Sequence, residues 1–122
     1  MQNIAIAQQI ARTIYDKKGV DIVALNVSEL TVLCDYMILA SGRSSRQVSA
    51  IADEIDERLA AQGLTPQRTE GLREGRWVIL DYGAVIVHLF HPEDREYYHL
   101  ERLWDEGSNR LVLTFDQTED AQ

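Results

Sequence analysis

The feature that most constrains the fold is a stretch of alternating side chains interrupted by one tight turn at Tyr82-Gly83. With the turn at these two residues, Asp81 pairs with Ala84 and Trp77 lies opposite His88. A three-residue loop would give a different register. The segment therefore predicts an antiparallel β-hairpin.

Because side chains alternate between the two sides of a strand, this hairpin has two different faces. One face is purely aliphatic and is predicted to be core: Val78, Leu80, Val85, Val87 and Leu89. The other, called the hairpin face below, carries polar and aromatic groups: Trp77, Ile79, Asp81, Ile86, His88 and Phe90. Such a mixture is expected where a sheet meets a partner. For Trp77 a position in the core beneath a helix is an equal alternative.

Length and composition predict a single folded domain, since the chain has 122 residues and is 45% hydrophobic. No apolar run approaches about 18 residues, so no transmembrane helix is expected. The N-terminus lacks a basic start followed by an apolar block, which argues against a signal peptide. The single cysteine, Cys34, fits a reducing cytoplasm. Residues 1–106 are expected to form the domain and residues 107–122 a variable tail.

Charge is distributed unevenly within a net charge of −8. Residues 1–52 hold five Lys/Arg and four Asp/Glu, whereas residues 53–122 hold seven and sixteen. An acidic half binds a phosphate backbone poorly, because such binding needs cations. It would instead attract a basic partner, or serve only to keep the protein soluble.

The order of the remaining elements predicts an α/β fold, a mixed sheet flanked by helices. The apolar spacing of each segment sets its type. Acidic residues 116–122 are expected to fray. The expected segments are helices over 3–17 and from Ser44 or Ser45 to Gln62, strands over 20–27 and 33–40, a short edge strand over 64–70, the hairpin, a last helix from Pro92, and a strand or ordered tail over 110–115.

One turn, over residues 41–47, resembles an anion site because Arg43 and Arg46 flank the start of a helix. A plain capped turn is the stronger interpretation, since neither a P-loop nor a GxGxxG motif is present. Nucleotidyl transfer would need paired carboxylates to hold a metal. Only Asp35 and Asp81 are candidates, and the sequence does not place them together.

The remaining candidates for catalysis or metal binding are weak. His88, His91 and His99 match no zinc motif, so surface or half-buried histidines are expected rather than a metal site. Cys34 is predicted to be a buried, inert thiol within a strand. The residues thus favour a binding module over an enzyme.

The motifs of this chain, from Ile4 to Trp104, resemble those of the ribosomal silencing factor family, also called the Iojap family. Asn26 stands where members often have Asp. The motifs are Asp35-Tyr36, Ser41-Gly42 with Ser44 and Gln47, Ala50-Ile51-Ala52, Glu70-Gly71, Trp77, Asp81-Tyr82-Gly83, Val87-His88 with Phe90, Arg95 with Tyr98, and Leu100 to Trp104.

The resemblance implies a nucleotidyltransferase-like topology without the catalytic residues, and no cofactor. It implies binding to a basic protein on the intersubunit face of the large ribosomal subunit, large-subunit protein fourteen. Bound there, members block joining of the small subunit and lower translation when nutrients are scarce. Organellar homologues act in large-subunit assembly, and homodimers occur. Retained nucleotide binding, an assembly role and a homodimer through the hairpin face are the alternatives.

Carried onto this sequence, the resemblance centres the contact on Trp77 and His88. The last helix contributes a stripe of Tyr98 and Arg102, while Tyr97, Leu100 and Trp104 are expected in the core. The neighbouring contact residues are Glu70, Arg76, Asp81, Tyr82, Tyr98 and Arg102.

Overall fold

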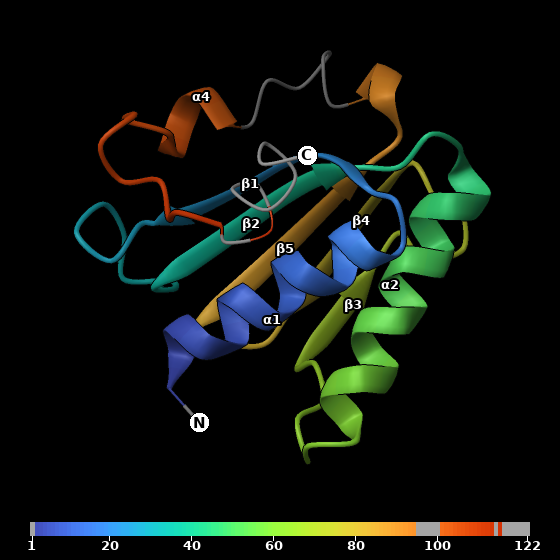
Figure 1. Ribbon diagram of the computed structural model, residues 1–122, viewed down its shortest axis with the longest axis horizontal. Coiled ribbons are helices and arrows are strands. Elements are labelled where there is room, and N and C mark those ends of the chain that lie inside the picture. The colour runs from blue at the N-terminus through green and yellow to red at the C-terminus, as the bar shows by residue number, and fades with distance from the viewer. Residues whose placement is uncertain (1, 95–100, 114, 116–122) are drawn as a thin grey trace.

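A computed structural model describes residues 2–94, 101–113 and 115, and it contains a five-stranded sheet with helices (Figure 1). The strand order is β1-β2-β5-β4-β3. Only β2 and β5 pair in parallel; the other neighbours are antiparallel. The mixed α/β class is confirmed. The elements are α1 (Asn3–Asp16), β1 (Val20–Asn26), β2 (Tyr36–Ser41), α2 (Ser45–Ala60), β3 (Arg68–Glu70), β4 (Trp77–Asp81), β5 (Val85–Phe90) and α4 (Glu101–Trp104).

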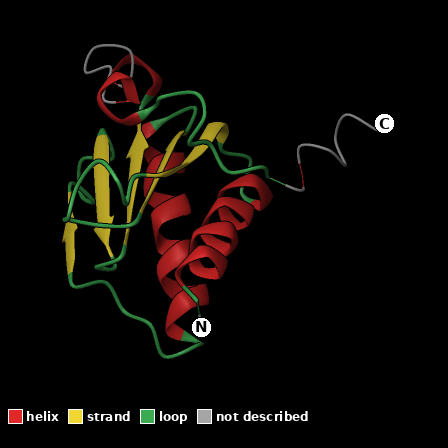
Figure 2. Cartoon of the chain, turned by 90° about the vertical axis from the view of Figure 1, so that its left-hand side faces the viewer, coloured by secondary structure: helices red, strands yellow, loops and turns green. Residues whose placement is uncertain are grey.

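Helices α1 and α2 cover one face of the sheet, as Figure 2 shows. Their apolar residues recur at helical spacing, so each presents one stripe to the strands. Ser44 caps α2, because its hydroxyl accepts a hydrogen bond from the Gln47 N–H at 3.1 Å. The predicted stripe of α2 is confirmed as buried: Val48, Ile51, Ala52, Ile55 and Leu59.

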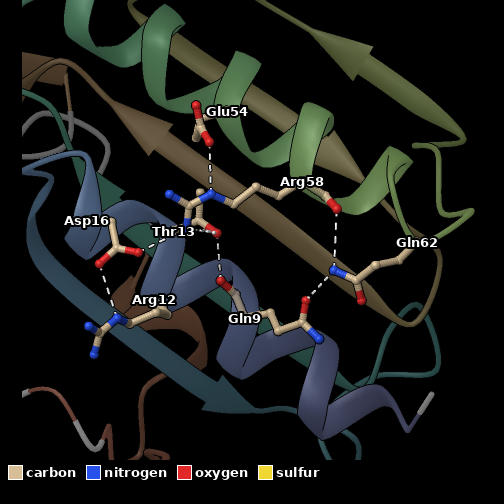
Figure 3. Close-up of polar contacts among 7 residues, drawn as sticks. All are labelled: Gln9, Arg12, Thr13, Asp16, Glu54, Arg58 and Gln62. Carbon is tan, nitrogen blue, oxygen red and sulfur yellow. Dashed lines mark hydrogen bonds and ion pairs between the residues drawn. The ribbon is translucent and has the colours of Figure 1, made fainter.

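Polar contacts on the outer side of the two helices join α1 to α2 (Figure 3). The Arg58 guanidinium donates to Asp16 at 2.9 Å and to Glu54 at 2.8 Å, and Arg12 also pairs with Asp16. The Arg58 pKa is raised by these carboxylates, and the Asp16 pKa is lowered chiefly by Arg58. These side chains are partly exposed, so each pair contributes at most about 1 kcal/mol.

The prediction of a strand over 33–40 is wrong at its start, because β2 begins at Tyr36. The preceding residues turn instead. The Leu33 N–H donates to the Thr31 hydroxyl at 3.1 Å, and the Asp35 N–H donates to the Ala84 carbonyl at 2.8 Å. Cys34 therefore lies in a loop rather than within a strand, although it is buried as expected.

The hairpin register also differs from the prediction. The Tyr82 N–H donates to the Val85 carbonyl at 2.9 Å, so the two turn residues are Gly83 and Ala84. Gly83 has a φ of 86°, a conformation that favours glycine. Trp77 thus lies opposite Phe90 rather than His88. Because the register moves by two residues, every side chain stays on its predicted face.

Residues after α4 pack back onto the domain. Leu25 and Arg110 form an antiparallel bridge, and the Leu111 N–H donates to the Ala24 carbonyl at 2.8 Å. Leu113 is buried in the core that the helices cover. Of the two predictions for residues 110–115, the ordered tail is confirmed for those that the structure describes. The domain boundary at residue 106 stays a prediction, and residues 116–122 lie outside the described residues.

None of the described helices is both long enough and apolar enough to cross a membrane.

Candidate partner-binding surface

The two faces of the hairpin have the predicted difference in burial. All five aliphatic residues, Val78, Leu80, Val85, Val87 and Leu89, are buried in the core beneath α1 and α2. The hairpin face points to the other side of the sheet and is only partly covered: Trp77, Ile79, Asp81 and Ile86 are half-buried, whereas His88 and Phe90 are buried. Two side chains of this face are therefore fixed by burial, while the other four remain accessible to a partner.

Three rings form the centre of the hairpin face. The Trp77 ring stacks on Phe90 with centroids 5.4 Å apart, and Phe90 stacks in turn against His88 at 6.2 Å. Trp77 and His88 are diagonal neighbours across the two strands, a position that long side chains bridge readily. The Trp77 indole N–H donates to His88 Nδ1 at 3.1 Å. Trp77 is thus anchored in one orientation while part of its ring stays accessible.

His88 is buried rather than half-buried, with 8% of its surface exposed. Burial lowers the pKa of His88 to about 4, because the charged imidazolium would lose its water. The neutral ring has one acceptor nitrogen, and Nδ1 uses it for the Trp77 N–H. His88 therefore acts chiefly as the support of Trp77.

Charged residues border this face on the β3 side. Directly paired residues of neighbouring strands share a face, so Glu70 lies beside Ile79 and Arg68 beside Asp81. The Arg68 guanidinium Nε lies 3.8 Å from the Glu70 carboxylate Oε2. The position of Arg68 was not predicted, because it follows from the β3 register, which no local pattern in the sequence reveals.

Arg76 directly precedes Trp77, the first residue of β4, and is held by the chain that follows β5. Its guanidinium donates to Asp94 at 2.5 Å and to Glu93 at 3.5 Å. Both carboxylates raise the Arg76 pKa, with Asp94 having the larger effect. Arg76 therefore borders the face as part of an ion pair. Its charge is used to hold the chain after β5 and is not free to meet a partner.

The structure separates one of the predicted contact residues, Tyr82, from this face. Tyr82 packs with the core on the helix side, and its buried hydroxyl has no hydrogen-bond partner among the described residues. Burial, and secondarily the charge of Asp56, raises the Tyr82 pKa to about 12. Arg102 is exposed on α4, and its contact with a partner stays a prediction.

Predictions about the last helix are only partly covered by the described residues. Tyr98 and its neighbours Tyr97 and Leu100 lie outside them. Trp104 is half-buried and packs against a buried apolar cluster on the side of the sheet away from α1 and α2. This cluster contains Phe90. Trp104 therefore lies at the edge of the core, whereas the prediction placed it within the core.

The candidate carboxylate Asp35 lies far from the candidate anion turn. Asp35 precedes β2, whereas the turn of residues 41–47 begins at its last residue, so about 20 Å of strand separates them. Asp35 and Asp81 both lie near Cys34, whose pKa is raised by burial first and by these charges second. Among the residues that the structure describes, no three His, Cys, Asp or Glu side chains group as ligands of one metal would. Nucleotide binding and a homodimer stay predictions.

Comparison with known proteins identifies the family of this chain. The family described as "Ribosomal silencing factor during starvation" matches residues 1–122. This chain belongs to the ribosomal silencing factor family. The match extends past Trp104, where the resemblance found in the sequence ended.

Relatives and a solved structure agree with this membership. "Ribosomal silencing factor RsfS" of Halalkalibacterium halodurans is 39% identical over 107 residues, covering 88% of this chain and 92% of that protein. "Mitochondrial assembly of ribosomal large subunit protein 1" of Mus musculus is 31% identical over 87 residues, covering 69% of this chain and 38% of that protein. A crystal structure from Chromobacterium violaceum is 39% identical with a TM-score of 0.83, covering 85% of this chain and 87% of that chain. The relatives are named for ribosomal roles rather than for a reaction.

Proposed function

We propose that this protein binds the large ribosomal subunit in the cytoplasm through large-subunit protein fourteen, a basic protein on the intersubunit face. Bound there, it blocks joining of the small subunit by steric exclusion and so represses translation under nutrient limitation. Membership of the ribosomal silencing factor family is the observation that carries the proposal.

The geometry of the hairpin face supports this proposal. Trp77 supplies an aromatic side chain that is anchored by His88 and Phe90 but not fully covered. Pre-anchored tryptophans bind with little loss of side-chain entropy, and they are enriched among interface hot spots. Glu70 and Asp81 place carboxylates on the same face, which suits a basic partner.

Charge reversal at the border of this face tests the proposal without disturbing the core. Glu70 is exposed on the edge strand, so Glu70→Lys is expected to fold normally. It is expected to weaken binding to purified large subunits about tenfold, since a lysine would meet a basic partner. Glu57→Lys, on the exposed outer side of α2, makes the same change in net charge and is expected to bind like the wild type. Equal loss in both variants would contradict docking through the hairpin face.

Removal of the central ring is expected to have a larger effect. Trp77→Ala is expected to weaken binding to the subunit by about 2 kcal/mol or more, because it removes the anchored ring at the centre of the face. Co-sedimentation measures the binding, and thermal melting followed by circular dichroism shows whether the variant is folded.

In a reassociation assay, wild-type protein at saturation is expected to lower the yield of joined ribosomes. Unchanged joining would refute the proposed activity.

A role in assembly of the large subunit is the second candidate, favoured by the name of the mouse relative. It uses the same contact but acts on precursors. Precursor rRNA accumulating in a deletion strain would support it, whereas normal precursor levels together with increased joining in starved cells would favour the anti-association role.

A further inference from the structure

Five exposed cations gather at one end of this acidic protein. They come from three segments that are far apart in the sequence: the turn after α1, the turn before and into α2, and the loop between β3 and β4. We call this group the basic end. Its members are Lys17, Lys18, Arg43, Arg46 and Arg73.

Gln47 ties the first two segments together. Its side-chain amide donates to the Lys17 carbonyl at 3.2 Å and to the Lys18 carbonyl at 3.1 Å. The same amide accepts a hydrogen bond from the Arg43 N–H at 2.5 Å. Figure 1 shows the end of α1 and the start of α2 at the same corner of the molecule. The backbones that carry Lys17, Lys18 and Arg43 are therefore held side by side.

The third segment packs against the first turns of α2. The Ser49 hydroxyl donates to the Leu72 carbonyl at 2.9 Å. Gly75 approaches so closely that a Cβ there would lie 2.4 Å from the Ser45 carbonyl oxygen. The loop that carries Arg73 is thus fixed beside the turn that carries Arg46.

The cations of the basic end differ from five other arginines of the described chain, which are paired with carboxylates. Within the part of the chain that the structure describes, none of the five makes an ion pair. The nearest acids in sequence are Asp16, Asp21, Glu70 and Glu74. Asp16 is already paired with Arg12 and Arg58, and Glu70 with Arg68, so the five cations still outnumber the remaining acids. By contrast, five arginines are paired with Asp or Glu: Arg12, Arg58, Arg68, Arg76 and Arg110.

The basic end adjoins the Trp77 end of the hairpin face. The Gly42 N–H donates to the Phe90 carbonyl at 2.9 Å, which joins the turn of Arg43 to the strand end opposite Trp77. On the other side, Gly71 lies against the Trp77 carbonyl, where a Cβ would be only 1.9 Å away. If a partner protein binds over Trp77, the basic end lies beside the contact. It would then face the molecule that lies next to the partner protein.

We propose that the basic end binds phosphates of ribosomal RNA that borders the protein-docking site. This inference rests on the proposed function, which places the chain on a particle of RNA and protein. Unpaired lysines and arginines suit a phosphate backbone, which they contact without reading sequence. The net charge of −8 disfavours binding to RNA in general, so the contact adds to docking rather than replacing it.

A set of neutral substitutions tests this inference: Lys17→Gln, Arg43→Gln, Arg46→Gln and Arg73→Gln together. Lys18 is left unchanged because its φ of 68° makes substitution there a test of the backbone as well. A control set brings the chain to the same net charge by adding four acids on exposed positions elsewhere. The control is Gln2→Glu, Gln8→Glu, Ala60→Glu and Thr65→Glu.

Binding is measured against three probes over a range of salt concentrations: purified large subunits, RNA-free large-subunit protein fourteen, and phosphatidylserine vesicles. The neutralised variant is expected to bind subunits about tenfold more weakly, with a salt slope shallower by about 2, since each lost phosphate contact removes somewhat less than one from the slope. Its affinity for the isolated protein is expected to match that of the control set.

The outcomes separate this inference from the proposed function. Equal affinity and equal salt slope for neutralised and control sets on subunits would overturn the RNA contact, while leaving the proposed function intact. Failure of wild-type protein to bind the isolated ribosomal protein, with a loss on subunits only in the neutralised set, would refute the proposed docking and support the RNA contact. Loss of binding to phosphatidylserine vesicles with unchanged binding to subunits would assign the basic end to a membrane and overturn the inference.

Discussion

Gly71→Ala is expected to destabilise the protein by about 3 kcal/mol or more, because two penalties combine at this position. Gly71 has a φ of 77°, in the left-handed region that side chains rarely adopt. A Cβ there would also lie 1.9 Å from the Trp77 carbonyl oxygen, so the backbone at the start of β4 must move. Urea unfolding followed by tryptophan fluorescence measures the change.

Gly63→Ala provides the matched control for Gly71→Ala. Gly63 follows α2 with a φ of 83°, but nothing lies within 4 Å of a Cβ there. Only the conformational penalty of about 1 to 2 kcal/mol is then expected. Similar losses in both variants would show that close packing against Trp77 contributes nothing. A larger loss in Gly71→Ala shows that β3 and the loop after it hold Trp77 in place.

Acidification is expected to destabilise the protein through His88. In the folded protein the His88 pKa is lowered to about 4, whereas an unfolded chain takes up that proton near pH 6.5. The unfolded state therefore binds more protons between these two values, and the free energy of unfolding rises with pH across that window. The contribution is complete above about pH 6.5 and is lost as the pH falls to about 4. Its size is about 3 kcal/mol.

His88→Asn isolates this effect, because an asparagine amide does not titrate and its oxygen can take the place of Nδ1 as acceptor for the Trp77 N–H. Urea unfolding at several values between pH 4 and 7 is expected to show a steep loss for the wild type and a flatter curve for the variant. Parallel curves would mean that His88 is protonated in the folded state without loss of its contact to Trp77.

Most of the fold followed from local patterns. Alternation in residues 77–90 separated the aliphatic face from the hairpin face, and helical spacing identified the buried stripe of α2. The register did not follow, because the turn uses Gly83 and Ala84 rather than Tyr82 and Gly83. The two turns are offset by one residue, which changes the partner of each paired residue by two, so the pattern of faces could not distinguish them.

The candidate site was predictable in its centre but not in its borders. Trp77, His88, Asp81 and Glu70 do share one face, as strand parity and the β3 pairing require. Tyr82 does not, since it is one residue out of phase and packs on the helix side. Within one strand, alternation along the chain determines the face on which each side chain lies. The strand beside which β3 pairs, and its register, are determined only by the tertiary structure.

By itself, the sequence determined which side chains share a face and which half of the chain is acidic, because alternation and charge are properties of neighbours in the chain. Only the tertiary structure decided that His88 is buried beneath Trp77 and that Lys17, Arg43 and Arg73 lie at one end. Burial and the convergence of charges depend on contacts between residues about 10 to 30 positions apart, and such contacts form only when the sheet and helices pack together.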